Sequence, residues 1–166
     1  MENELICNGE FVFSHKTICL TISLDIPSEL DFEGNTFVKN TFLHVSLVCV
    51  GKIIEKNNIL IPDFESKVIN DFCEFSKNNE IKKVNYTDDF KFVSKEDKKT
   101  IVVMCDIPNL NKFFDLINKK YKLKIEYPPL HATLYTLPGK LGIFLTDSND
   151  IKQFTKSITN PLSRPL

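Results

Sequence analysis

The spacing of hydrophobic and polar positions divides the first part of the chain into two strands with an irregular segment between them. Alternation over residues 17–26 predicts a half-buried strand that stops at Pro27. A second strand is predicted over residues 42–50 and ends at Gly51. The residues between them, 28–40, show weak periodicity and several turn formers. We interpret this segment as a loop, with a single helical turn as the alternative.

The rest of the chain changes between helical and strand patterns. Apolar residues recur every three or four positions from Pro62 to about Lys77, and again from Pro108 to about Lys120, which predicts two helices. A run of charges at 95–99 is typical of a solvated turn between two strands. The later predicted elements are strands at 84–93, 100–107, 130–137 and 141–145, and a last helix from Asp147 or Ser148 to Ser157. Because no Gly-rich turn joins a strand to a helix, the pattern favours an α+β fold over a doubly wound nucleotide-binding fold.

Composition and charge narrow the class of protein. The chain has 166 residues, 42% hydrophobic and 26% charged, which is typical of one globular domain spanning 1–166. Its net charge of −1 lacks the basic excess of proteins that bind duplex nucleic acid. Arg164 is the only arginine, so bidentate guanidinium clamps are not expected in the body of the domain. Any recognition of phosphate is therefore expected to be local.

The cysteines and the N-terminal sequence predict the compartment. The five cysteines are odd in number and never form a C-x-x-C motif, and three of them lie in apolar runs, where thiols behave as small buried hydrophobes. The five cysteines are Cys7, Cys19, Cys49, Cys73 and Cys105. Residues 1–5 lack the order of a signal peptide, and no apolar run approaches membrane-spanning length. We therefore expect a reducing compartment, the cytoplasm, and no membrane partner.

Two of the three histidines lie in matching tetrapeptides, His44-Val-Ser46-Leu and His131-Ala-Thr133-Leu. Since residues i and i+2 of a strand point to the same face, each tetrapeptide presents an imidazole and a hydroxyl about 6.6 Å apart, at a rise of roughly 3.3 Å per residue. His15 repeats the hydroxyl offset but is followed by the charged Lys16. We interpret His15 as an exposed residue or one at a strand edge.

This set of side chains suits phosphodiester chemistry. One neutral imidazole accepts a proton from an attacking water or hydroxyl, and a second, protonated imidazole gives a proton to the leaving oxygen. Histidine is suited to both roles because its ordinary pKa, about 6.5, allows both forms near neutral pH. The hydroxyls donate to the other phosphate oxygens. Two imidazoles supply both proton transfers, so we expect no metal and no cofactor.

The two tetrapeptides resemble the paired H-x-[ST]-apolar motifs of the 2H phosphoesterase superfamily, which includes RNA 2′,3′-cyclic phosphodiesterases, also called 2′-5′ RNA ligases. The likeness extends in order of elements over about residues 17–146. It implies a bilobal fold, with two pseudo-symmetric lobes, each a small antiparallel sheet with helices, around a central cleft. It also implies that His44 and His131 are the catalytic pair and that Ser46 and Thr133 bind phosphate.

Several further residues are candidates for the outer part of such a site. Because no arginine lies close after the second motif, Tyr135, Lys140 or Lys52 is expected to contact the substrate. Tyr135, two residues after Thr133, is predicted to share its face, with sheet packing as an equal alternative. Phe42 is predicted on the face of His44, and the hydrophobic core is its more common place.

The resemblance implies a metal-independent phosphodiesterase acting on a 2′,3′-cyclic phosphate of RNA or a nucleotide. An alternative within the same class is cleavage of 2′-5′ oligoadenylates or cyclic-nucleotide signals. A second alternative is a non-catalytic nucleotide- or RNA-binding module, and a third is an interaction domain with a Phe-rich surface. Assays of turnover and of ligand binding separate these hypotheses.

Overall fold

The chain folds as an α+β protein, and the structure, a computed structural model, describes residues 3–166. Within these residues it has four helices and ten strands. The α+β class predicted from the sequence is confirmed. The chain divides into two compact units: the first takes the residues up to Leu20, Ser46–Val84 and Ile107–Pro128, and the second takes Thr21–Val45, Asn85–Asp106 and Pro129–Leu166. The pseudo-symmetry of two lobes stays a prediction.

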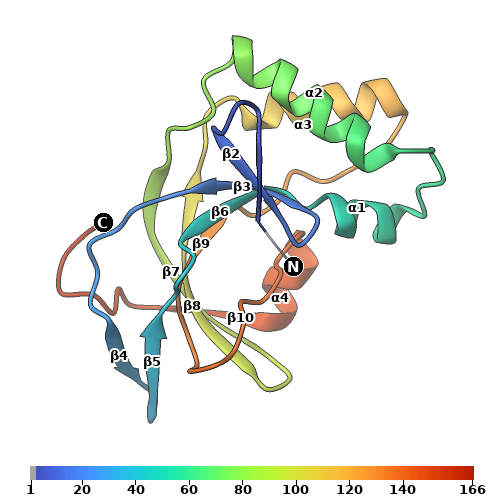
Figure 1. Cartoon of the computed structure of the whole chain (residues 1–166). Helices are drawn as coiled ribbons and strands as arrows, with labels where there is room; N and C mark the ends of the chain where they lie inside the picture. The colour runs from blue at the N-terminus through green and yellow to red at the C-terminus, as the bar shows by residue number, and fades with distance from the viewer. Residues whose placement is uncertain (1–2) are drawn as a thin grey trace. The chain divides into compact units, whose positions relative to one another are not determined.

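The first unit contains an antiparallel meander and three helices. Its elements are β1 (Glu4–Ile6), β2 (Phe11–Ser14), β3 (Thr17–Thr21), α1 (Val50–Asn57), α2 (Phe64–Asn78) and α3 (Leu110–Tyr121). Helices α2 and α3 lie side by side (Figure 1), and Asp71 of α2 accepts hydrogen bonds of 2.6 Å from both Lys120 and Tyr121 of α3. Phe72 meets Phe11 and Phe113 edge to face, with ring centroids 4.9 and 5.2 Å apart. Such ring pairs contribute beyond the area they bury.

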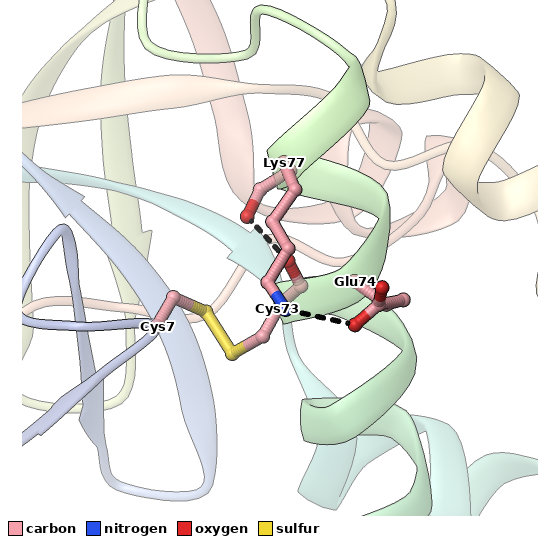
Figure 2. The surroundings of a disulfide bond; sticks show 5 residues. Cys7, Cys73, Glu74 and Lys77 are labelled. Carbon is pink, nitrogen blue, oxygen red and sulfur yellow. Dashed lines mark hydrogen bonds and ion pairs between the residues drawn. A yellow bond between two sulfur atoms is a disulfide. The ribbon is translucent and has the colours of Figure 1, made fainter.

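A disulfide between Cys7 and Cys73 joins the turn after β1 to α2 (Figure 2). Cys19, Cys49 and Cys105 are not part of a disulfide. Burial raises the pKa of both Cys19 and Cys105 to about 12, so these two thiols stay protonated. A disulfide is typical of oxidising compartments, so the Cys7–Cys73 bond does not favour the reducing compartment expected from the sequence.

The second unit is an antiparallel sheet with one helix. Its elements are β4 (Glu29–Phe32), β5 (Asn35–Lys39), the start of β6 (His44–Val48), β7 (Asn85–Lys95), β8 (Lys98–Asp106), β9 (His131–Thr136), α4 (Ser148–Phe154) and β10 (Thr155–Ile158). Strand β9 pairs with β8 along one edge and with β5 and β6 along the other. Strand β8 pairs in turn with β7, and β7 with β10. The two candidate histidines, His44 and His131, therefore lie on adjacent strands of this unit.

Most of the long predicted elements are confirmed. The helices expected from 62 to 77 and from 108 to 120 are α2 and α3. The strands expected at 42–50, 84–93, 100–107 and 130–137 correspond to β6, β7, β8 and β9. Asp147 is the N-cap of α4, and its side chain accepts a hydrogen bond from the backbone of Asp150. The strand expected at 17–26 is shorter, because only Thr17–Thr21 pairs as β3.

The loop predicted at 28–40 is wrong, since these residues form the β4–β5 hairpin (Figure 1). Phe32 pairs with Asn35, so Glu33 and Gly34 make a two-residue turn, and both have positive φ. Two-residue hairpin turns of this kind match the twist of the strands they join and favour glycine. The sequence signal for this hairpin was the alternation of apolar Leu30 and Phe32 shortly before Gly34.

Three other predictions are wrong. Residues 141–145 form no strand, although Ile143 and Leu145 are buried with Val93 and Val102 in the core of the second unit. The last helix ends at Phe154, and the residues that follow pair with β7 as β10. The strand predicted to end at Gly51 ends at Val48, and Gly51 lies in helix α1, which the pattern did not predict.

Gly51 allows a close approach instead. Its backbone N–H donates to the carbonyl of Lys16 at 3.0 Å, and a Cβ on Gly51 would lie 3.0 Å from the Cβ of Lys16. Few Cβ contacts are this close, so a side chain at position 51 would require Lys16 to shift by a few tenths of an ångström.

Reduction of the Cys7–Cys73 disulfide should lower the free energy of unfolding of the first unit by about 2–4 kcal/mol, because the bond constrains a long loop in the unfolded chain. The two cysteines are 66 positions apart. Denaturant unfolding with and without dithiothreitol measures the change. The Cys7→Ser/Cys73→Ser double variant is the control and should not respond to dithiothreitol. Equal stability of the oxidised and reduced protein would contradict a structural role for the bond.

Candidate active site

The pairing of β6 with β9 brings the two histidine motifs together. Val45 is paired with Ala132 in antiparallel register. Because antiparallel partners run in opposite directions, the adjacent pair is His44 and Thr133, whose Cα atoms are expected about 4.5–5.5 Å apart. His131 is then the diagonal neighbour of His44, at roughly 7–8 Å between Cα atoms. The two predicted catalytic residues and Thr133 therefore lie together in the second unit.

These three side chains share one face of the sheet. Val45 and Ala132 are fully buried on the opposite face, while His44 and His131 are half-buried and Thr133 is 9% exposed. On the other edge of β9, His131 is paired with Met104 of β8. Strand alternation thus aims both imidazoles and one hydroxyl to the same side, as the tetrapeptides predict.

Each histidine ring is held in the same way by a backbone carbonyl two residues earlier. Nδ1 of His44 lies 2.8 Å from the carbonyl oxygen of Phe42, and Nδ1 of His131 lies 2.9 Å from that of Pro129. A carbonyl oxygen can only accept, so Nδ1 carries the hydrogen in both rings. In the neutral form, Nε2 then has the lone pair, and the ring is oriented for proton transfer through that nitrogen.

The two imidazoles influence one another. The pKa of His131 is lowered, first by burial and also by the nearby charge of His44, while the hydrogen bond to Pro129 acts in the opposite direction. The rings therefore lie within electrostatic reach. At neutral pH, His131 is held in the neutral form that can accept a proton.

Phe42 packs on His44 and does not belong to the core. Its ring is stacked on the imidazole, with centroids 4.4 Å apart and planes inclined by 22°. Phe42 is half-buried, so the expectation that it lies in the hydrophobic core is wrong. The stacked ring limits the orientations of the imidazole and covers one of its faces.

A β-bulge changes the direction of Tyr135. Thr133 is paired with Val102, but Tyr135 is paired with the next residue of β8, Ile101, so Leu134 is an extra residue in β9. The bulge turns Tyr135 to the face opposite Thr133, and the prediction that the two share a face is wrong. Tyr135 is fully buried, and its hydroxyl donates to the carbonyl oxygen of Pro27 at 2.9 Å. It is placed for packing and not for contact with a substrate.

The segment after β9 lies beside the Thr133 hydroxyl. A Cβ on Gly142 would be 3.7 Å from Thr133 Oγ1 and 3.9 Å from its Cγ2. A side chain at position 142 would therefore occupy space next to the hydroxyl that an oxygen of a ligand can use. Sequence reasoning missed Gly142, because nothing in the pattern of residues 137–147 indicates this contact.

The predicted lysine contacts have acidic partners. Lys140 Nζ forms an ion pair with Asp97 in the β7–β8 turn of the same unit, and this ammonium holds the pKa of Asp97 below its usual value. Lys52 belongs to the first unit, where its Nζ lies 3.3 Å from Glu55 of the same helix. Both ion pairs are exposed, and such pairs are weak enough to exchange partners.

Ser46 also belongs to the first unit, and there its hydroxyl has a neighbour that the sequence did not indicate. A hydrogen bond from Ser46 reaches the Cys19 thiol and acts against the burial that raises the pKa of that thiol. Within β6, Ser46 follows the buried Val45 and is half-buried like His44, as strand alternation requires.

The remaining predictions concern His15, metals and membranes. His15 is exposed in the β2–β3 turn, as expected, and its Nδ1 lies 3.0 Å from the hydroxyl of Ser14. Among residues 3–166, no group of three or more His, Cys, Asp or Glu side chains is arranged to hold a metal ion. Within the same range, every helix is too short or too polar to cross a bilayer.

Comparisons of the chain with protein-family models, with curated proteins and with solved structures find no match. The chemistry of the site is therefore inferred from its residues and their geometry.

Replacing His44 with Gln should raise the pKa of His131 toward its ordinary value of 6.5, because one of the two causes that lower it is removed. The rise should be partial, since burial remains. Titration of the His131 ring protons by NMR measures it, and the His15→Gln variant is the control that should leave the value unchanged. A pKa of His131 that does not move, or that falls, would show that the two rings are not coupled.

Replacing Tyr135 with Phe should lower the free energy of unfolding by about 1 kcal/mol, the usual loss for one hydrogen bond, because the bond to Pro27 disappears while the ring still fills its place. Substrate turnover should stay as in the native protein. Denaturant unfolding and a turnover assay measure the two effects, and a large fall in turnover with unchanged stability would restore Tyr135 to the site.

Proposed function

We propose that this chain is a phosphodiesterase of the two-histidine type, which hydrolyses a 2′,3′-cyclic phosphate on RNA or a nucleotide. The observation that carries the proposal is the shared arrangement of His44 and His131. They lie on adjacent strands, point to one face and have Nδ1 on a carbonyl, and the charge of His44 lowers the pKa of His131. The proposal includes the 2H-like bilobal fold.

The lowered pKa of His131 favours this residue as the general base. Its Nε2 takes a proton from a water molecule, whose oxygen attacks phosphorus. The bond from phosphorus to one ribose oxygen then breaks, and protonated His44 gives its Nε2 proton to that oxygen. The product is a phosphomonoester beside a free hydroxyl, and both imidazoles return to their starting forms once a proton passes from His131 back to His44.

The other groups stabilise the negative charge that develops on phosphate. The Thr133 hydroxyl is next to His44 and can donate to a non-bridging oxygen. Lys140 is proposed as an outer, exchangeable contact for phosphate charge. Tyr135 is left out of the proposed site because its hydroxyl is used within the fold.

Substitution of either His44 or His131 by Ala should lower kcat by at least about 10²–10⁴-fold, the range typical of general acid–base groups. The assay follows hydrolysis of 2′,3′-cyclic nucleotides and of RNA with a 2′,3′-cyclic end, in the presence of EDTA. His15→Ala, which changes an exposed histidine outside the motifs, is the matched control and should keep full activity.

The outcomes separate the competing functions. Full activity in either variant would refute the assignment of the pair, and loss of wild-type activity in EDTA would refute the metal-independent mechanism. Cleavage of 2′-5′ oligoadenylate or of 3′,5′-cyclic nucleotides alone would replace the substrate. Binding of cyclic nucleotides without product would instead assign the chain to non-catalytic nucleotide binding.

A further inference from the structure

One asparagine joins the two histidine motifs through the backbone. The side-chain amide of Asn40 donates to the carbonyl oxygen of Phe42 at 3.2 Å and to that of Thr133 at 3.1 Å. Its backbone N–H donates to the carbonyl of Leu134 at 2.8 Å. Both side-chain acceptors are carbonyl oxygens, so the NH₂ end of the amide must face them. All these residues belong to the second unit.

The β-bulge explains why an amide is needed at this place. Strand β9 pairs with β6 at Ala132 and with β5 from Tyr135 onward, and the bulge at Leu134 lies between these two stretches. The carbonyls of Thr133 and Leu134 lie at this gap in the ladder, and both accept hydrogen bonds from Asn40. Asn40 lies between β5 and β6, and it supplies donors to both. Backbone groups left without partners are costly, so this position favours a residue with two donors in line.

The hydrogen bond from Asn40 to Phe42 also affects His44, one of the two candidate catalytic residues. The Phe42 carbonyl accepts from Asn40 and also from Nδ1 of His44, the bond that fixes the tautomer of that ring. We infer that Asn40 is a positioning residue for the two-histidine site: by holding the Phe42 and Thr133 carbonyls together, it sets the orientation of the His44 ring relative to Thr133. This inference rests on the proposed function for its effect on turnover, but its effect on the His44 ring does not depend on that function.

Replacement of Asn40 by Asp, which has the same shape, tests the inference. The ionised carboxylate cannot donate and faces two carbonyl oxygens, so kcat should fall by about 10–100-fold, the range for partners that orient ligand histidines in metal sites. The KM should change little, because the hydroxyl of Thr133 is retained. As the pH falls toward about 4, the carboxyl becomes protonated and can donate again, so the ratio of variant to wild-type activity should rise.

A second readout is independent of catalysis. In ¹⁵N NMR spectra of the wild-type protein, His44 should show the tautomer with hydrogen on Nδ1, and in the Asn40→Asp protein at neutral pH this tautomer should lose population. Asn40→Ala adds no charge and provides both readouts should the Asp variant fail to fold. Asn35→Asp is the control for the added charge, because Asn35 lies in the β4–β5 hairpin, where its side chain donates to the Glu33 carbonyl. Its kcat and its His44 tautomer should match those of the wild type.

The two readouts distinguish failure of the inference from failure of the proposed function. An inactive wild type whose His44 tautomer still depends on Asn40 would overturn the phosphodiesterase and keep the positioning role. The positioning role would be overturned if both Asn40 variants kept the wild-type kcat and the wild-type His44 tautomer, and if their activity relative to the wild type did not vary with pH.

Discussion

Antiparallel pairing between β6 and β9 determines which side chains of the two motifs can meet. With Val45 opposite Ala132, the polar members of both motifs lie on one face and their apolar members on the other. A shift of one residue would turn either set to the wrong side. Burial of Val45 and Ala132 resists such a shift, because it would expose the apolar residue of the shifted strand and bury its imidazole instead. The candidate chemistry therefore depends on hydrophobic packing beneath the sheet.

The histidine rings are oriented mainly by main-chain atoms. Each Nδ1 meets the carbonyl two residues before it, and both carbonyls come from segments that enter a strand at the site. Such partners cannot be lost by substitution at their own positions, and they do not titrate. Asn40, the polar side chain that we infer to position the site, bonds to the carbonyl of Phe42 and not to a ring.

The sequence predicted the parts of the site that depend on periodicity. His44, His131 and Thr133 share a face because strands alternate, and this rule needs only the local pattern. The alternation rule failed for Tyr135, because the bulge at Leu134 arises from the pairing of β9 with β8. The hydrophobic pattern of the sequence does not indicate it. Asn40 and Gly142 were missed for a related reason: their roles come from contacts across the sheet. The β4–β5 hairpin and α1 were missed because Gly34 was interpreted as part of a loop and Gly51 as the end of a strand. Gly34 in fact completes a turn, and Gly51 permits a close contact.

The Cys7–Cys73 bond has a consequence for the connectivity of the protein. Between these residues the chain leaves the first unit after Leu20, builds β4, β5 and the start of β6, and returns at Ser46. The bond thus closes a covalent ring that contains this whole excursion. A single proteolytic nick at the exposed Glu33–Gly34 turn would open the ring without releasing a fragment, and the N-terminal piece would stay attached through sulfur until a reductant frees it.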